Sequence, residues 1–375
     1  MKGTFTSSFS RYSFLIGKCV ILIRIGGELG IKSRRTRSRM LMHLKRNIRS
    51  LLVQSQDFKI TEFRDRLILY SNSDEHLEEL AHTISTSISG VSSVSLALVV
   101  KSTEEDIISA GVSKAKAVIQ PDTSFRVTTR REGNHPFSSM EIAAKLGEKI
   151  LTTPIENIRV DLKAPDHQIY LDIRGPLTFI YTQIYHGIDG IPSQAQGTAI
   201  ALVRPNFNSI FASWLMKKRG VQILPVFFKT GKPTENNFQD WIQQEFGHPL
   251  KIMSIIPILQ LYRDEQSLCL ICQKVCEQIC QNLAIQSDLQ VISSPTCFNY
   301  NDELMSLEAF KLLERDTKLT VIRPIQMGYF SEEEFELPLD RDPCCIFRPQ
   351  VSLQVSENFK KIDFEKIALK VDCFN

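Results

Sequence analysis

The cysteines are the residues of this chain whose type and spacing best suit chemistry. Cys269 and Cys272 form a Cys-x-x-Cys pair that precedes a predicted helix, and Cys276 and Cys280 continue one face of it in four-residue steps. Nine cysteines in 375 residues, several of them clustered, do not fit a secreted disulfide scaffold. They indicate a metal, a cluster or redox chemistry, although the packing face of a buried helix gives the same pattern.

A strand, a short polar turn and a helix form a second candidate site. Residues 199–203 are continuously apolar, as in a strand buried in a parallel sheet. Pro205, Asn206 and Asn208 break this run, and a helix then continues to its expected end at Gly220. In open α/β sheets such a turn binds phosphate at the helix N-terminus. Close approach of phosphate normally needs glycine, and this turn has none.

A donor-rich loop ends at another predicted helix N-terminus. Ser138 and Glu141 have the spacing of a capping box, which starts the helix. The loop before them contains Arg130, Arg131, Asn134, His135, Pro136 and Phe137. Such a loop suits a phosphate or a 3′-terminal nucleotide, and a capped helix behind a surface loop is the alternative.

A basic stretch near the start of the chain indicates an anionic partner. Leu41, Leu44, Ile48 and Leu51 define one apolar helix face. The cations of the preceding loop and the opposite face are Lys32, Arg34, Arg35, Arg37, Arg39, Lys45, Arg46 and Arg49. Acidic residues hardly interrupt them, which favours nucleic acid over a merely solvated helix face.

The composition is that of an ordinary globular protein large enough for two or three domains. Apolar residues make up 43%, charged residues 23%, and the net charge is +3. No apolar run reaches the roughly 18 residues that span a bilayer. Residues 1–18 lack the apolar core of a signal peptide and are expected to be a disordered leader.

Alternating strand and helix patterns must position these groups. Strands are expected at 20–25, 59–63, 66–70, 91–100, 124–129, 159–162, 168–173 and 179–184, and helices at 77–88 and 104–118. The strands at 59–63 and 66–70 read as a hairpin around Asp65.

Several of these motifs, in this order, resemble the tRNA 4-thiouridine synthetase family (ThiI). The matching stretches are ILIRIGGELGIKSRRTR with the later KRNI, VSSVSLALVV, SFRVTTRREGNHPFSSMEIAAKLG, VDLKAPDHQIYLDIRG and YHGIDGIP. Gly27 before Glu28 is a small departure, because the family usually has an acid directly after the first glycine. The resemblance implies a ferredoxin-like domain followed by a THUMP domain, with tRNA as the partner.

The resemblance also assigns RNA-binding residues. Those expected to contact the tRNA end are Arg130, Arg131, His135, Phe137 and Ser139. Those expected to contact its phosphates are Lys32, Arg34, Arg35, Arg37 and Arg46.

In this family a third domain, the PP-loop domain, uses ATP to adenylate a uridine oxygen that sulfur then displaces. Its signature Ser-Gly-Gly-x-Asp-Ser falls on residues 204–209, where only Ser209 is kept. Arg204 stands at the first position and is able to bind an anion, whereas Asn208 replaces a Mg²⁺-binding acid. The segment VISSPTCFN also departs from the pattern of this family. These replacements predict weak or altered binding of ATP and magnesium.

Archaeal-type relatives carry Cys-x-x-Cys here and another cysteine near the C-terminus, and three thiolates hold an iron–sulfur cluster. DPCCIFRP resembles the second site, so Cys269 and Cys272 with Cys345 or Cys344 are the expected ligands and catalytic residues. Three ligands leave one iron open for sulfide. A zinc site, a redox disulfide and the absence of any metal are the alternatives.

The resulting prediction is a three-domain protein of α+β and α/β type. Its parts are a leader (1–18), a ferredoxin-like domain (19–75), a THUMP domain (76–190) and a Rossmann-like parallel-sheet PP-loop domain (191–375). The expected function is tRNA thiolation in the cytoplasm, without a membrane. A sulfur donor, an active thiolation enzyme and a second copy of the chain are candidate partners. A non-catalytic tRNA-binding paralogue is the first alternative, and a metal-dependent regulator is another.

Overall fold

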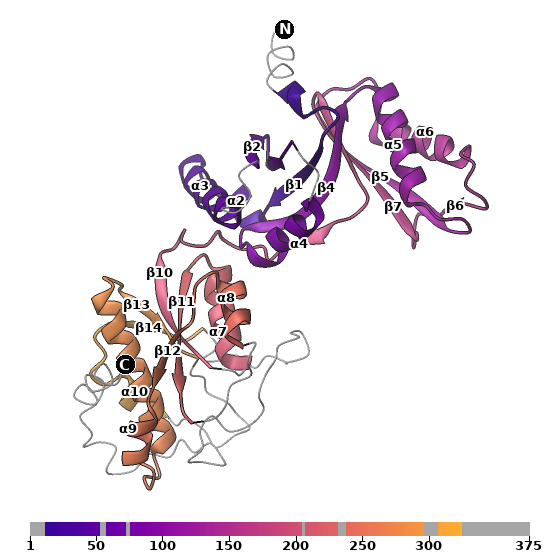
Figure 1. Cartoon of the computed structure of the whole chain (residues 1–375). Coiled ribbons are helices and arrows are strands. Elements are labelled where there is room, and N and C mark those ends of the chain that lie inside the picture. Colours follow the sequence, from indigo (N-terminus) through magenta and orange to yellow (C-terminus); the bar gives the residue numbers. More distant parts are fainter. Residues whose placement is uncertain are drawn as a thin grey trace. The chain divides into compact units, whose positions relative to one another are not determined.

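The computed structural model describes residues 12–52, 58–72, 76–204, 207–231, 238–295 and 307–324. The chain divides into two compact units, Met1–Gly190 and Ile191–Asn375, whose helices and strands are labelled in Figure 1.

The described part of the first unit is built on one nine-stranded sheet. Its strands are β1 (Cys19–Ile25), β2 (Lys59–Phe63), β3 (Arg66–Tyr70), β4 (Val91–Lys101), β5 (Ser124–Glu132), β6 (Arg159–Val160), β7 (His167–Arg174), β8 (Leu177–Tyr181) and β9 (Tyr185–His186). The order is β2-β3-β1-β4-β8-β7-β5-β6, and β9 pairs with β4. Strand β4 pairs with β1 on one side and β8 on the other, so it joins the two halves of the sheet. The boundary expected at residue 75 falls between β3 and the next helix and stays a prediction.

The longer helices of this unit cover one face of the sheet. The helical segments are η1 (Ser13–Leu15), α2 (Gly27–Gly30), α3 (Arg34–Leu51), α4 (Leu77–Ser87), α5 (Glu104–Val118) and α6 (Ser139–Leu151). On β4, Val94 packs in the cluster that includes α3 and α4, and Val100 packs against the cluster of α5 and α6. These two residues are six apart, and side chains alternate along a strand, so both helix pairs lie on the same face (Figure 1).

The opposite face is free of long helices and is strongly curved. Phe63 on β2 meets Phe179 on β8 with ring centroids 5.9 Å apart. Four strand spacings separate these strands in the sheet, which is about 19 Å for a flat sheet. The sheet therefore curls around a second core that includes Val20, Leu22 and Val99.

Residues 12–18 correct one expectation, because they are not a disordered leader. Leu15 is completely buried in the core of the curved face. The Tyr12 hydroxyl donates a hydrogen bond to the Glu62 carbonyl oxygen at 2.9 Å, and the Gly17 amide donates to Val99 at 2.8 Å. Burying an apolar side chain offsets the entropy cost of ordering the segment. Residues 1–11 lie outside the described part.

The second unit has an all-parallel sheet in its described part. Its strands are β10 (Thr198–Val203), β11 (Gln222–Lys229), β12 (Lys251–Ser254), β13 (Val291–Ser293) and β14 (Thr320–Ile322), in the order β12-β11-β10-β13-β14. Its helices are α7 (Phe207–Lys218), α8 (Phe238–Phe246), α9 (Ile256–Leu261), α10 (Leu268–Gln286) and α11 (Leu307–Glu314). Helices α7 and α8 pack on one face, and α9, α10 and α11 pack on the other. The expected α+β and α/β fold is confirmed.

The strand order of this sheet reverses between β10 and β13, and in open α/β sheets ligands bind at the carboxyl ends of strands at such a point. Among the described residues, none of the helices combines the length and apolar character needed to cross a bilayer.

Gly187 gives a test of how the end of the first unit is fixed. A Cβ atom at Gly187 would overlap the carbonyl oxygen of Val91, a backbone atom that cannot move aside alone. We expect Gly187→Ala to lower the free energy of unfolding by about 1–3 kcal/mol, the usual cost of overpacking. Urea denaturation measures the change.

Gly27→Ala is the matched control, because nothing lies within 4 Å of a Cβ atom there. It should leave stability nearly unchanged or raise it slightly. Equal effects of the two substitutions would contradict the packing of residue 187 against β4.

Candidate functional site

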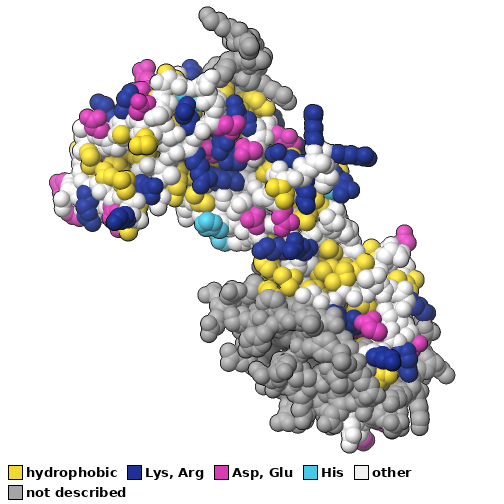
Figure 2. Space-filling view, turned by 180° about the vertical axis from the view of Figure 1, so that it is seen from behind, with side chains coloured by type: hydrophobic (Ala, Val, Ile, Leu, Met, Phe, Trp, Pro, Cys, Tyr) yellow, Lys and Arg dark blue, Asp and Glu magenta, His cyan; other side chains and the backbone are white. Residues whose placement is uncertain are grey.

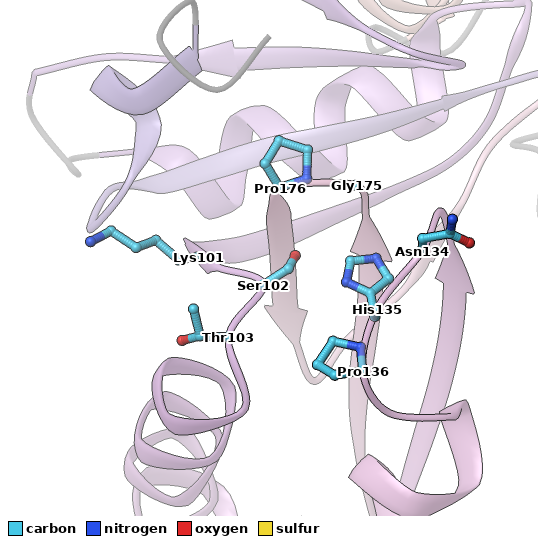
Figure 3. A pocket seen from close by; sticks show the side chains of 8 residues that line it. All are labelled: Lys101, Ser102, Thr103, Asn134, His135, Pro136, Gly175 and Pro176. Atoms are coloured by element: carbon cyan, nitrogen blue, oxygen red, sulfur yellow. The ribbon is translucent and has the colours of Figure 1, made fainter. Parts of the chain in front are cut away.

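A pocket of about 330 Å³ opens at one end of the first unit's sheet, between the loops that follow β4 and β5. Its lining residues are Lys101, Ser102, Thr103, Asn134, His135, Pro136, Gly175 and Pro176. Figure 3 shows Ser102 and Thr103 on one side, His135 and Pro136 on the other, and Gly175 and Pro176 above. None of the eight residues is acidic, so the lining suits an anion better than a cation.

The β4 side of the pocket is the start of helix α5. Thr103 is its N-cap, and its side-chain oxygen accepts a hydrogen bond from the Asp106 amide at 3.2 Å. Beside it, the hydroxyls of Ser102 and Thr178 share a hydrogen bond of 2.9 Å. Lys101 is exposed at the end of β4. This side therefore combines a capped helix start with an exposed cation.

The β5 side is the loop that carries His135. The His135 ring stacks on Phe137 with centroids 5.6 Å apart, and its Nε2 lies 3.4 Å from the Glu132 carbonyl oxygen. Burial lowers the pKa of His135, and the positive charges of Arg131 and Arg64 lower it further. The imidazole is therefore neutral at pH 7 and gains a proton more readily when an anion binds beside it.

Glu132 anchors this loop to two other elements. Its carboxylate accepts hydrogen bonds from Arg64, in the β2–β3 turn, and from Arg174, at the end of β7, each at 2.5 Å. Arg174 also donates to Asp172 at 2.6 Å. Gly175 lies against the Arg64 guanidinium with a φ of +57°, where a side chain would both strain the backbone and overlap that group. The curvature of the sheet thus brings the β2–β3 turn to the pocket.

The structure separates the residues predicted to hold the tRNA end. Arg131 lies near His135 and donates to the Gly133 carbonyl oxygen at 3.3 Å. Arg130, the next residue on the same strand, points to the opposite, helix-free face. Ser139 is half-buried in the first turn of α6.

Phe137 corrects a prediction. It is 5% exposed and belongs to the core beneath α5 and α6, so it supports the His135 ring and offers no surface for RNA. The predicted capping box at Ser138 and Glu141 is present, and it occupies both side chains.

The predicted phosphate-binding residues lie on helix α3 and the turn before it. Leu44 and Ile48 bury the apolar face of the helix. The outward residues are Lys32, Arg34, Arg35 and Arg46, which are exposed, and Arg37, which is partly exposed. The Arg46 guanidinium donates a hydrogen bond to Nδ1 of His43 at 3.0 Å. Their exposure leaves these cations available to solvent and to an anionic partner.

In the second unit the predicted cysteine pair lies in the first turns of α10. Cys269, Cys272, Cys276 and Cys280 are all buried. The Arg204 guanidinium, at the end of β10, lies 3.9 Å from the Cys272 sulfur. Burial raises the pKa of the Cys280 thiol, which keeps that residue protonated. Cys344 and Cys345 lie outside the described residues, and no group of three metal-binding side chains occurs within them.

Ser209, the residue kept from the PP-loop signature, is committed to its own turn. Its buried hydroxyl donates to the Leu202 carbonyl oxygen at 3.2 Å and accepts from the Arg204 amide at 2.7 Å. Pro205, Asn206 and the side chain of Asn208 lie outside the described part. The turn is therefore stabilised by contacts that leave the serine hydroxyl little capacity for phosphate.

Sequence reasoning missed most of the pocket, because only its β5-side loop was a candidate site. Lys101, Ser102 and Thr103 lie between the strand expected at 91–100 and the helix expected at 104–118, and the sequence assigns them no role. Thr103 followed by Glu104, Glu105 and Asp106 is a helix-start signal, but it does not reveal the distant loop that the helix start faces.

The first unit of the chain matches two known domain families. The ThiI ferredoxin-like domain model matches residues 20–95, and the THUMP domain model matches residues 101–183. Among similar curated proteins are two named "Probable tRNA sulfurtransferase". The one from Methanosarcina mazei is 26% identical over 339 residues, 82% of this chain and 81% of the relative. The one from Methanosarcina acetivorans is 29% identical over 71% of this chain and 68% of the relative.

Two solved structures share the architecture. PH1313 from Pyrococcus horikoshii has 28% identity and a TM-score of 0.61, over 84% of this chain and 97% of that one. A 4-thiouridine synthetase, solved with RNA and bound ATP, has 20% identity and a TM-score of 0.66, over 94% and 86%. The chain is therefore a THUMP-domain protein. Its domain order and its relatives make it similar to the tRNA 4-thiouridine synthetase (ThiI) family.

The Glu132 anchor makes stability depend on pH. Hydrogen bonds from Arg174 and Arg64 lower the pKa of Glu132 in the folded protein. Because the pKa is lower in the folded protein, the ionised carboxylate stabilises the fold at pH values above the unfolded pKa. This stabilisation is lost as the pH falls through the folded pKa. We expect Glu132→Gln to cost up to about 1 kcal/mol at pH 7, because the carboxylate is half exposed and screened. The cost should shrink once the pH falls below the unfolded value of about 4.3, and it should disappear below the lowered folded value.

Chemical denaturation across this pH range measures the difference. Glu148→Gln on the exposed side of α6 is the matched control and should cost little at any pH. A Glu132→Gln cost that persists unchanged in acid would contradict an anchor made by the ionised carboxylate.

Proposed function

We propose that the protein binds tRNA and acts in the thiolation of a tRNA uridine. Relatives named as probable tRNA sulfurtransferases support this proposal, because they match this chain over most of their length. The structural neighbour solved with RNA supports an RNA partner. The observation that carries the proposal is the acid-free pocket between the β4 and β5 loops.

The pocket fits the end of an RNA strand better than a duplex. Its volume of about 330 Å³ lies at the small end of ligand pockets, which suits one nucleotide rather than a helix. Asn134 and Lys101 are exposed at its rim and are able to donate to phosphate or ribose oxygens. The exposed cations of α3 then supply contacts to the phosphates of the stem, which carry no sequence information but set affinity.

The thiols supply the second part of the proposal. Cys269 and Cys272 lie three residues apart in the first turns of α10, a spacing at which both thiols can ligate one cluster, and both are shielded from solvent. With Cys345 or Cys344 they would hold an iron–sulfur cluster, which would supply a site for the sulfur that is transferred to tRNA. Arg204 beside Cys272 would offset the negative charge of the thiolates. Zinc ligation and a redox disulfide at the same cysteines are the competing assignments.

One observation favours a second candidate function. The Ser209 hydroxyl is bonded within its own turn, and Arg204 reaches toward Cys272. A turn used in this way would bind ATP weakly, which fits a non-catalytic paralogue that binds tRNA and assists an active thiolation enzyme.

Lys101 tests the RNA part. We expect Lys101→Gln to weaken binding of unmodified tRNA by roughly three- to ten-fold, the effect of losing about one charge-assisted contact. The slope of log affinity against log salt should fall by about one. Fluorescence anisotropy at several salt concentrations measures both.

Lys116→Gln is the control, because Lys116 is an exposed cation on α5 that does not line the pocket. Equal tRNA affinity and salt slope for wild type and Lys101→Gln would rule out the pocket as the RNA-end site.

Cys269 tests the thiol part. Protein purified without oxygen should contain iron, and Cys269→Ala should lose it together with any 4-thiouridine formed in tRNA from ATP and sulfide. Cys280→Ala, at a buried and protonated thiol of the same helix, should keep the iron. Elemental analysis and mass spectrometry of tRNA nucleosides are the measurements. Iron-free wild-type protein would exclude the cluster, and tRNA binding without thiolation would favour the paralogue.

A further inference from the structure

The helix-free face of β5, β7 and β8 carries a row of stacked groups that the pocket does not use. The ring of Tyr181 on β8 and the ring of Tyr170 on β7 are stacked with centroids 5.0 Å apart and an angle of 11° between planes. The guanidinium carbon of Arg24 lies over the Tyr181 ring at 4.6 Å. One face of a ring cannot hold both neighbours, so Arg24 and Tyr170 lie on opposite faces of Tyr181.

The row ends at Tyr170. Tyr181, in the middle, is 3% exposed, whereas Tyr170 is only partly buried. The face of the Tyr170 ring that points away from Tyr181 is turned toward β5, where Thr128 is the register partner of Tyr170. Threonine is smaller than tyrosine, so the surface of the sheet beside the Tyr170 ring is lower at Thr128. This low position follows the row of rings.

Two arginines flank this low position. Arg126 and Arg130 lie two residues before and after Thr128 on β5 and therefore share its face. In the described part of the chain, Arg130 makes no hydrogen bond or ion pair, and Arg126 uses one nitrogen to donate to the Leu162 carbonyl oxygen at 3.0 Å. The Thr128 hydroxyl is buried without a hydrogen-bond partner among the same residues. Figure 2 shows Lys and Arg side chains beside apolar and acidic ones on one face of this unit.

We propose that this face is a second RNA site, which binds one nucleotide of a single strand. The base stacks on Tyr170 above Thr128 and extends the row Arg24–Tyr181–Tyr170 by one ring. Arg126 and Arg130 bind the phosphates on either side of it. Aromatic stacking with flanking cations is how β-sheet surfaces hold unpaired nucleotides, whereas a duplex hides the faces of its bases.

This site is distinct from the pocket. Arg131 and His135 lie on the helix side of β5, and Arg130 with Thr128 lies on the other side. The inference rests on the proposed function only in taking RNA as the ligand class. Its test therefore uses a short single strand for this face and tRNA with Lys101→Gln for the pocket.

The probe is an eight-nucleotide oligoadenylate with one 2-aminopurine, whose fluorescence is quenched when the base stacks. We expect wild type to quench it on binding. Tyr170→Leu should bind roughly ten-fold more weakly and lose the quenching, because one base–aromatic stack is removed. Tyr170→Phe keeps the ring and should behave as wild type. Arg130→Gln should weaken binding several-fold and flatten its salt dependence, and Lys116→Gln should not.

Thermal unfolding shows whether the Tyr170→Leu variant is folded. If it is not, the separate variants Arg130→Gln and Tyr170→Phe still decide the test. Unchanged oligoadenylate affinity and quenching in folded Tyr170→Leu or in Arg130→Gln overturns the site. Loss of quenching in Tyr170→Phe also overturns it, since the ring is still present. If Lys101→Gln alone weakens tRNA binding while these variants bind the oligoadenylate as wild type, the proposed function stands and this second site falls.

Discussion

The curvature of the first unit's sheet is the constraint on which its functional surfaces depend. Four strand spacings separate β3 from β7, yet Arg66 lies 3.6 Å from Asp172 and Arg64 bonds Glu132. A flat sheet would hold those strands about 19 Å apart, beyond the reach of these side chains. Because the sheet curls, a turn of the ferredoxin-like part holds the loop that carries the pocket histidine of the THUMP part.

Local signals in the sequence were enough for most elements of this unit. The hairpin around Asp65 and the capping box at Ser138 and Glu141 are where their patterns predicted them, because each depends on residues within a few positions. Only the β5-side loop of the pocket was predicted. Lys101 and His135 meet through strand order and sheet curvature, which no local pattern encodes. Phe137 was misassigned for the same reason, since its burial depends on packing by α5 and α6.

Helix α10 shows a different limit of sequence reading. The spacing of its cysteines predicts one apolar packing face. The polar residues of the helix are then expected on the opposite face, exposed to solvent. The structure buries the polar residues as well. Glu277 accepts hydrogen bonds from Gln273 at 2.7 Å and from Ser294 at 2.6 Å, and it pairs with Arg323 at 2.9 Å. Partners distant in sequence satisfy these groups, so periodicity could not reveal their burial.

Strand β5 shows why the two proposed RNA sites are compatible with one sheet. Successive side chains on a strand point to opposite faces, so Arg131 serves the pocket side while Arg130 serves the curved side. The strand ends at Glu132, whose ion pairs with Arg64 and Arg174 fix the start of the pocket loop. An RNA strand bound at both proposed sites would pass around the end of β5, without crossing the helices.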